Sequence, residues 1–306
     1  MNKQTTNTVL MVRPVAFVKN EQTAISNHFQ QDILSTPNAI QEKALKEFNG
    51  FVKALKDVGV KVLVIEDTKE PHTPDSIFPN NWISFHEGGT VAVYPMEAVN
   101  RRDERREEVL ELVEENGLQI NNVIDYTEAE EEGVFLEGTG SMVLDRQYKK
   151  AYCALSSRAD EDLFVEFCED FDYDPVIFRA NQTVKGNRKP IYHTNVMLCI
   201  GEKFAVICLD AIDDKKEKKN VLQHLKQTNK DIIAITEEQM HSFAGNMLEL
   251  KGNNKQILVM STQARESLKT EQLVKLEKYC YLLTVNISTI ETLGGGSARC
   301  MLAEVF

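Results

Sequence analysis

A repeated strand signal constrains the fold of this chain more than any other feature. Five short runs rich in β-branched residues begin at residues 61, 119, 175, 231 and 284, so their spacing stays between 53 and 58 residues. Such residues favour β-strands, and a nearly fixed spacing indicates one supersecondary unit repeated along the chain. The runs are Lys61–Glu66, Gln119–Ile124, Pro175–Phe178, Asp231–Ile235 and Thr284–Ser288.

Each run is followed by a loop and then by two further apolar runs that flank a turn. Glycine and polar residues, as in His86-Glu-Gly-Gly89, supply the turns. Apolar residues at a spacing of three to four then predict a helix, for example over 102–115 and 263–279. The repeating unit is therefore strand, loop, hairpin and helix. The predicted hairpins pair 82–85 with 90–94, 142–144 with 151–154, 196–200 with 204–208, and 247–250 with 257–260.

The fifth unit is divided between the two ends of the sequence. Met301–Val305 reads as the first strand of its hairpin, Thr8–Val12 as the second, and Asn38–Val58 as its helix. An array that joins its last unit to its first is closed, and closure leaves no sheet edge exposed. We therefore expect residues 1–306 to form a single α/β domain, a five-bladed pseudosymmetric α/β propeller closed by its terminal strands.

Composition narrows the classes of function. A net charge of −12 and a pI near 5.1 argue against a nucleic-acid partner, which needs a basic surface. No apolar run approaches the roughly 20 residues of a membrane span, and the first residues lack the apolar core of a signal peptide, so we expect a cytoplasmic protein. Its six cysteines show no CxxC spacing, and neither a metal nor another cofactor is expected. The sequence does not decide whether the protein forms homo-oligomers.

In a closed ring, the loops between each lone strand and its hairpin converge on the axis. These loops carry acid, amide, imidazole and thiol groups, which together allow covalent catalysis. Each group alone also has a structural interpretation: a packed histidine, a turn carboxylate, or a tight glycine loop. Their equivalent positions in the repeat favour the catalytic interpretation. The loops are 75–81, 135–140, 192–195, 240–246 and 294–300.

These loops resemble those of the guanidino-group modifying superfamily, which includes arginine deiminases, dimethylarginine dimethylaminohydrolases and amidinotransferases. The specific motifs are Gly-Gly-Gly-Ser-Ala-Arg-Cys300, Leu136-Glu137-Gly, and His193 at the head of a strand. Phe78-Pro-Asn-Asn-Trp82 and Tyr192-His-Thr-Asn195 are similar to the branch named for citrulline utilization. The resemblance covers essentially the whole chain, and it implies a pentein-type five-bladed propeller that needs no cofactor.

The resemblance also implies roles for individual residues. Cys300 would be the nucleophile, His193 the general acid and base, and Glu137 a hydrogen-bond partner of the substrate's nitrogens. The implied substrate-binding residues are Asp75, Asn80, Asn81, Asn195 and Arg158, and the arginine would receive the substrate carboxylate. The glycines before Cys300 would let a planar head group lie against the backbone.

Two positions depart from relatives that act on arginine, where carboxylates stand in place of Asn81 and Asn195. Burying a guanidinium without carboxylates costs several kcal/mol, whereas an amide matches both sides of a neutral ureido group. We therefore expect a hydrolase that converts citrulline to ornithine, carbon dioxide and ammonia. An arginine deiminase, a dimethylarginine hydrolase and an amidinotransferase are the alternatives. The roles of His241 and Arg299 stay open.

Overall fold

The computed structural model describes residues 3–306 and contains five three-stranded sheets. In each sheet the first two strands pair antiparallel, and the third joins the second in parallel. The sheets are β17 (Ala303–Val305), β1 (Thr8–Arg13) and β2 (Lys61–Glu66); β3 (Ile83–His86), β4 (Thr90–Val93) and β5 (Asn122–Asp125); β6 (Met142–Asp145), β7 (Lys150–Ala154) and β8 (Asp174–Phe178); β11 (Leu198–Ile200), β12 (Phe204–Ile207) and β13 (Asp231–Ala234); β14 (Leu248–Lys251), β15 (Gln256–Ser261) and β16 (Tyr281–Val285).

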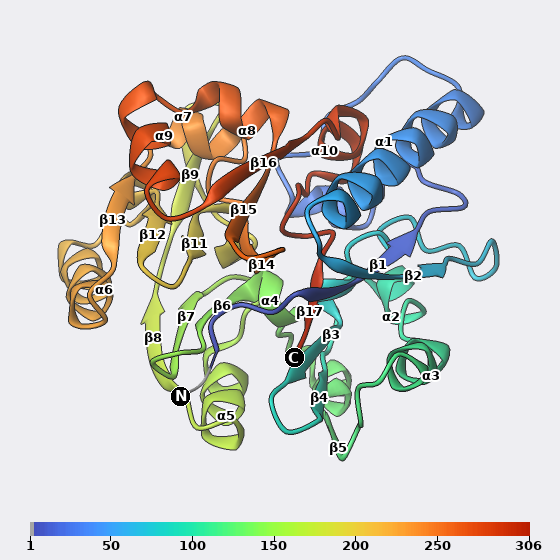
Figure 1. Ribbon diagram of the computed structural model, residues 1–306, viewed down its shortest axis with the longest axis horizontal. Coiled ribbons are helices and arrows are strands. Elements are labelled where there is room, and N and C mark those ends of the chain that lie inside the picture. Colours follow the sequence, from blue (N-terminus) through green and yellow to red (C-terminus); the bar gives the residue numbers. More distant parts are fainter. Residues whose placement is uncertain (1–2) are drawn as a thin grey trace.

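Pairing of the two chain ends confirms the prediction of a divided unit. Thr8 pairs with Val305 and Leu10 with Ala303 in an antiparallel register, so β17 and β1 form the hairpin of one sheet. β17 packs beside β3, and β11 packs beside both β6 and β14. The first strands therefore lie toward the centre of the molecule (Figure 1), where β3, β11 and β17 are buried along their whole length.

The helices cover the outside of the sheets (Figure 1). The longest, α1, has Pro37 at its first position and buries a stripe that includes Phe48 and Leu55. Asp160 and Asp214 cap α5 and α6 by accepting backbone N–H groups. The α-helices are α1 (Pro37–Asp57), α2 (Val99–Arg102), α3 (Glu108–Glu115), α4 (Gly138–Ser141), α5 (Glu161–Asp170), α6 (Lys215–Gln227), α7 (Glu237–His241), α8 (Thr262–Ser267), α9 (Thr270–Glu277) and α10 (Ser288–Gly294).

Two predicted helices are interrupted, and two predicted strands begin at other residues. The strand expected from 119 begins at Asn122. The helix expected over 102–115 is interrupted between α2, which ends at Arg102, and α3, which begins at Glu108, where Arg101 and Glu104 form a buried ion pair. The helix expected over 263–279 becomes α8 and α9, because buried Leu268 between them is extended. The last lone strand begins at Tyr281 rather than 284, where it pairs with Ile257 of β15.

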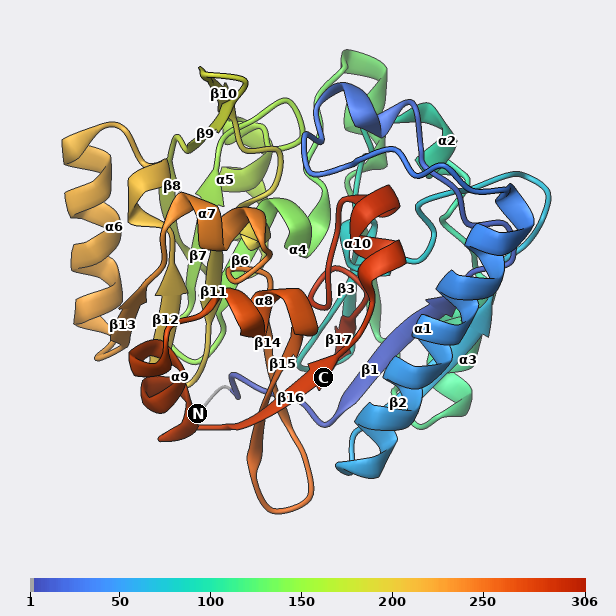
Figure 2. The ribbon, with the colours of Figure 1, turned by 90° about the horizontal axis from the view of Figure 1, so that it is seen from above.

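Short elements complete the chain between the sheets. Five 3-10 helices are η1 (Thr23–Ile25), η2 (Pro79–Asn81), η3 (Thr127–Glu132), η4 (Thr194–Val196) and η5 (Leu209–Ala211), and a separate hairpin is β9 (Asn181–Val184) with β10 (Asn187–Pro190). Figure 2 shows this hairpin and the segment between β1 and α1 on the same side of the molecule. Among residues 3–306, no helix is both long enough and apolar enough to cross a bilayer.

Candidate active site

Three loops that lead into inner strands bring Glu137, His193 and Cys300 together. Glu137 immediately precedes α4 and β6, His193 precedes η4 and β11, and Cys300 precedes β17. All three side chains are buried. These are equivalent positions in three sheets, which is why the repeat in the sequence predicts their convergence.

His193 and Glu137 form a buried pair, with Nε2 of the histidine 2.7 Å from Oε2 of the glutamate. Burial lowers the pKa of His193, and Glu137 offsets this only in part, so the imidazole is neutral at pH 7. Burial alone raises the pKa of Glu137, but Arg158 and His193 outweigh it and hold that pKa below its usual range. The ionised carboxylate therefore accepts the Nε2–H, which leaves Nδ1 to exchange protons.

A glycine makes room for this histidine. A Cβ atom on Gly140 would lie 2.8 Å from Nδ1 and Cε1 of His193 and 2.4 Å from Nδ2 of Asn81. Such contacts are shorter than van der Waals packing allows. The Glu137-Gly-Thr-Gly140 sequence thus provides both the Glu137 carboxylate and the space that the ring of His193 occupies.

Burial favours the neutral thiol form of Cys300. Its side chain is 3% exposed, and burial raises the pKa of the thiol, although hydrogen bonds from Ser297 and Asn246 oppose the rise. Nδ2 of Asn246 lies 3.2 Å from Sγ, and Oδ1 of Asn195 lies 3.7 Å from it. The sulfur thus has an amide donor and an amide acceptor beside it.

One small cavity adjoins these groups. It has a volume of about 10 Å³, room for about one water molecule. Five predicted site residues line it, namely Asp75, Asn81, Arg158, His193 and Cys300, together with Asn27, Phe78, Arg101, Tyr192, Gly294 and Gly296. Tyr192 and Phe78 belong to motifs noted in the sequence, but no signal in the sequence singles out Asn27.

The two carboxylate oxygens of Asp75 differ in their hydrogen bonding. Its Oδ2 accepts hydrogen bonds from Nδ2 of Asn20 and Oγ1 of Thr23, each at 2.9 Å. Its Oδ1 is buried and receives no hydrogen bond from residues 3–306. A buried acceptor without a donor is costly, so this oxygen is suited to bind a ligand's N–H group.

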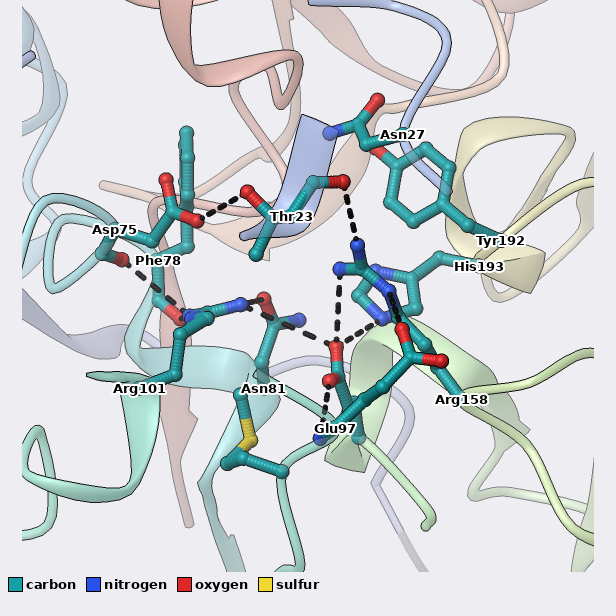
Figure 3. A network of polar contacts seen from close by, with 12 residues as sticks. Thr23, Asn27, Asp75, Phe78, Asn81, Glu97, Arg101, Arg158, Tyr192 and His193 are labelled. Carbon is teal, nitrogen blue, oxygen red and sulfur yellow. Dashed lines mark hydrogen bonds and ion pairs between the residues drawn. The ribbon is translucent and has the colours of Figure 1, made fainter. Parts of the chain in front are cut away.

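Two arginines contribute to the cavity wall (Figure 3). Arg158 donates to Oε2 of Glu137 at 3.4 Å, to Oε2 of Glu97 at 3.1 Å and to the carbonyl oxygen of Thr23 at 3.0 Å. Arg101 donates to Oδ1 of Asn81 at 2.8 Å. A guanidinium is the side chain best matched to a carboxylate, so either can receive the acid group of an amino acid.

A segment between β1 and α1, residues 14–36, closes the cavity through these same groups. Asn20 and Thr23 bond Asp75, and Ser26 Oγ accepts from Arg158 at 2.7 Å. Asn27 donates to the carbonyl oxygens of Gly294 and Gly295, each at 3.3 Å. We call residues 14–36 the covering segment.

Two predicted substrate ligands lie behind the cavity wall. Asn80 donates to Oγ1 of Thr139 at 3.3 Å, and Asn195 donates to the carbonyl oxygen of Thr139 at 3.1 Å. Neither side chain lines the cavity. Asn195 instead has its Oδ1 3.7 Å from Sγ of Cys300.

The glycine run packs against an aromatic ring beside the cavity. Cβ atoms on Gly294 and Gly296 would lie 2.7 and 2.9 Å from the ring of Phe78, and all three residues line the cavity. Gly295 has a φ of +63° and accepts a 2.6 Å hydrogen bond from the hydroxyl of Tyr192. The glycines thus allow aromatic packing beside Cys300.

The two residues left open by the sequence lie away from the cavity. The ring of His241 packs against Phe29 with centroids 5.6 Å apart. Arg299 donates to Oε2 of Glu304 at 3.0 Å and to the carbonyl oxygen of Leu302 at 2.9 Å. Within 3–306, no group of three or more His, Cys, Asp or Glu side chains is placed to hold a metal ion.

The family described as N,N dimethylarginine dimethylhydrolase, eukaryotic, matches residues 13–306. No match was found among curated proteins.

Solved structures show the same fold. The apo arginine dihydrolase ArgZ of the ornithine-ammonia cycle in cyanobacteria superposes with a TM-score of 0.75 at 18% identity, over 97% of this chain and 40% of that one. The substrate-bound N-terminal domain of a variant of ArgZ gives 0.74 at 17% identity over 97% of both chains. An adduct of a dimethylarginine dimethylaminohydrolase variant with S-methyl-L-thiocitrulline gives 0.64 at 16% identity over 99% of this chain and 100% of that one. The chain thus spans less than half the length of full ArgZ.

Proposed function

The chain belongs to the N,N-dimethylarginine dimethylhydrolase family, whose members are hydrolases of guanidino C–N bonds, and from this premise we propose that it is a cysteine-dependent hydrolase of citrulline. The proposed reaction consumes one water and releases ornithine, carbon dioxide and ammonia. In this proposal residues 1–306 act as one catalytic domain, a closed five-bladed propeller of the citrulline-utilization branch.

One observation carries the proposal: a thiol, a base and a spare carboxylate oxygen meet at one buried cavity. Cys300, His193 and Asp75 all line it, and Oδ1 of Asp75 lacks a donor among the residues described. A nucleophile, a proton carrier and an acceptor for N–H groups are the minimum needed to hold and attack a planar C–N centre.

The charges on the cavity wall favour a neutral head group. Within the described chain, Asp75 is the one acidic side chain that lines the cavity, whereas Arg101 and Arg158 both line it. Both arginines are already paired, Arg101 with Glu104 and Arg158 with Glu97 and Glu137. A guanidinium would therefore have Asp75 as its one acidic partner among the lining residues, and incomplete pairing of a buried charge is costly. A ureido group can donate to Asp75 and accept from Nδ2 of Asn81 without adding charge.

The proposed chemistry passes through a covalent thiol adduct. His193 first accepts the thiol proton of Cys300, the thiolate attacks the ureido carbon, one C–N bond breaks, and the leaving nitrogen takes that proton from His193. Water, deprotonated by the same imidazole, then cleaves the S–C bond. The resulting carbamate loses carbon dioxide, so the two nitrogens end in ornithine and ammonia. Glu137 holds His193 in the tautomer that exchanges protons at Nδ1.

Substrate entry requires the covering segment to move. A cavity of about 10 Å³ cannot hold an amino acid, and the segment's hydrogen bonds to Asp75 and Arg158 occupy groups that a substrate would use. We infer that the amine and carboxylate of the substrate replace these hydrogen bonds as the segment closes over the substrate.

Hydrolysis of arginine or dimethylarginine is the second candidate. The family description and the names of the solved relatives favour it, and the spare oxygen of Asp75 could also pair with a guanidinium. An amidinotransferase would use the same thiol but would transfer its adduct to an amine.

Product analysis separates these functions. Purified protein is incubated with citrulline, arginine or dimethylarginine, and ornithine, citrulline, ammonia and carbon dioxide are quantified. We expect equal amounts of ornithine, ammonia and carbon dioxide from citrulline, and none from Cys300→Ser. Cys199→Ser, which alters a thiol of similar burial, controls for general effects. Rapid conversion of arginine or dimethylarginine to citrulline, with citrulline left intact, would overturn the choice of substrate.

A further inference from the structure

A buried asparagine from the fourth-unit loop donates directly to the nucleophile. Asn246 lies between α7 and β14, is fully buried, and places Nδ2 3.2 Å from Sγ of Cys300. We propose that Asn246 is a catalytic residue that stabilises the Cys300 thiolate. The inference rests on the proposed function for the role of Cys300 as nucleophile.

The orientation of the Asn246 amide is fixed by its second partner. Its oxygen, Oδ1, accepts the backbone N–H of Arg299 at 3.1 Å. A backbone N–H can only donate, so the atom facing it must be the carbonyl oxygen and the amide cannot be flipped. The NH₂ group therefore faces the sulfur. Because an NH₂ group only donates, its bond is strongest when the sulfur is the anionic acceptor.

The second asparagine beside the sulfur, Asn195, presents an acceptor to it instead of a donor. Oδ1 of Asn195 lies 3.7 Å from Sγ and can accept an S–H, but it also receives Nδ2 of Asn246 at 3.2 Å. The neutral thiol thus has an acceptor in Asn195, and the thiolate has a donor in Asn246. This pairing gives each protonation state of Cys300 its own partner.

The backbone holds Asn246 rigidly in this place. A Cβ atom on Gly245 would lie 2.4 Å from the carbonyl oxygen of Val196, so the loop packs directly on the strand entry beside Asn195. Nδ2 of Asn246 also donates to the carbonyl oxygen of Asn195 at 3.0 Å. The donor therefore stands in position before the thiol ionises, and no reorganisation is needed at that moment.

The need for such a donor follows from the burial of the sulfur. Burial raises the pKa of the Cys300 thiol, and the Asn246 bond works against that rise. Arg299 does not supply a direct contact, because its guanidinium points to Glu304. The amide of Asn246 supplies a side-chain donor 3.2 Å from the sulfur.

Alkylation of Cys300 tests the proposal without any substrate. The rate of iodoacetamide reaction at Cys300 is followed from pH 6 to 11.5, as peptide-resolved mass increase, in wild type, Asn246→Ala and Asn246→Asp. Cys300→Ser provides the blank. Asn121→Ala, which removes an exposed turn amide bonded to Gly88, is the matched control. Circular dichroism and thermal unfolding report whether each variant is folded.

We expect Asn246→Ala to raise the pH midpoint of alkylation by about one unit and to slow the reaction about tenfold below that midpoint. Asn246→Asp keeps the shape and the Arg299 contact but sets a carboxylate beside the sulfur, so its midpoint should rise further. Asn121→Ala should match wild type. If Asn246→Ala does not fold, Asn246→Asp carries the test.

A folded Asn246→Ala or Asn246→Asp with the wild-type midpoint would overturn the proposal and leave Asn246 a packing residue. The titration is independent of turnover. A wild type that alkylates as predicted but does not hydrolyse citrulline would therefore count against the proposed substrate and not against Asn246.

Discussion

The two carboxylates of the site, Glu137 and Asp75, differ in how many of their oxygens accept hydrogen bonds. Oε2 of Glu137 accepts from His193 at 2.7 Å and from Arg158 at 3.4 Å, while its Oε1 accepts the backbone N–H of Glu97 at 3.1 Å. Asp75 bonds only through Oδ2, to Asn20 and Thr23 of the covering segment, and its Oδ1 has no donor in residues 3–306.

This difference separates two tasks. A saturated carboxylate cannot accept a further ligand without losing a partner, so Glu137 is suited to orient His193. A carboxylate with a spare oxygen is destabilising in the resting protein, and that cost is recovered only when a ligand donates to it. We infer that the Glu137 side is fixed catalytic machinery and that the Asp75 side is a binding site closed by the covering segment.

Glu137→Gln should show the largest effect. Loss of the charge that orients His193 should reduce kcat about 10³-fold. Glu137 raises the pKa of His193 against the lowering by burial, so its removal should lower that pKa and move the acidic limb of the kcat profile to lower pH. Glu130→Gln, which alters a glutamate paired with Arg105 outside the cavity, is the control. An unmoved limb would show that Glu137 does not act through His193.

Asp75→Asn should reduce kcat/KM by about 10- to 100-fold through loss of a charged hydrogen bond to the substrate. Because the variant removes a buried carboxylate with a spare oxygen, its free energy of unfolding should be unchanged or higher. Steady-state kinetics and urea unfolding measure the two. A variant that is less stable by more than about 2 kcal/mol with unaltered KM would make Asp75 structural.

Asn81→Asp should change selectivity more than rate. The new carboxylate keeps the acceptor for Arg101 and adds negative charge to the wall, so the ratio of kcat/KM for arginine to that for citrulline should rise about tenfold. Both substrates are assayed with the same enzyme batch. If the ratio stays at the wild-type value, Asn81 does not select the head group.

Thr23→Val should have the smallest effect. It removes one hydrogen bond between the covering segment and Oδ2 of Asp75, which is worth about 1 kcal/mol. Because the substrate replaces this bond, we expect about a fivefold decrease in KM with kcat nearly unchanged, and faster proteolytic cleavage within residues 14–36 of the substrate-free protein. Wild-type cleavage together with wild-type KM would mean that this bond does not hold the segment.

Much of the fold could be predicted because its signals are local. β2 occupies the predicted range Lys61–Glu66, and α1 differs from the predicted helix by one residue at each end. The regular spacing of the repeat also predicted the pairing of the terminal strands, because each end of the sequence holds only part of the fifth unit. Equivalent positions in the repeat likewise placed Glu137, His193 and Cys300 in one site.

The remaining features depend on tertiary contacts. The buried Arg101–Glu104 pair interrupts a helix that local spacing predicts as continuous. The contact of Asn246 with Cys300 joins residues 54 positions apart, and the covering segment is recognisable only once its bonds to Asp75 and Arg158 are visible. No periodic pattern encodes contacts of this kind.

The most direct test of the account is a competition between substrates. Wild-type protein receives citrulline, arginine and dimethylarginine together at equal concentration, and the disappearance of each is followed in one vessel, which gives the ratios of kcat/KM. The account predicts that citrulline is consumed first and that ornithine accumulates in step with it. Preferential loss of arginine or dimethylarginine would contradict the claim that this site selects a neutral ureido group.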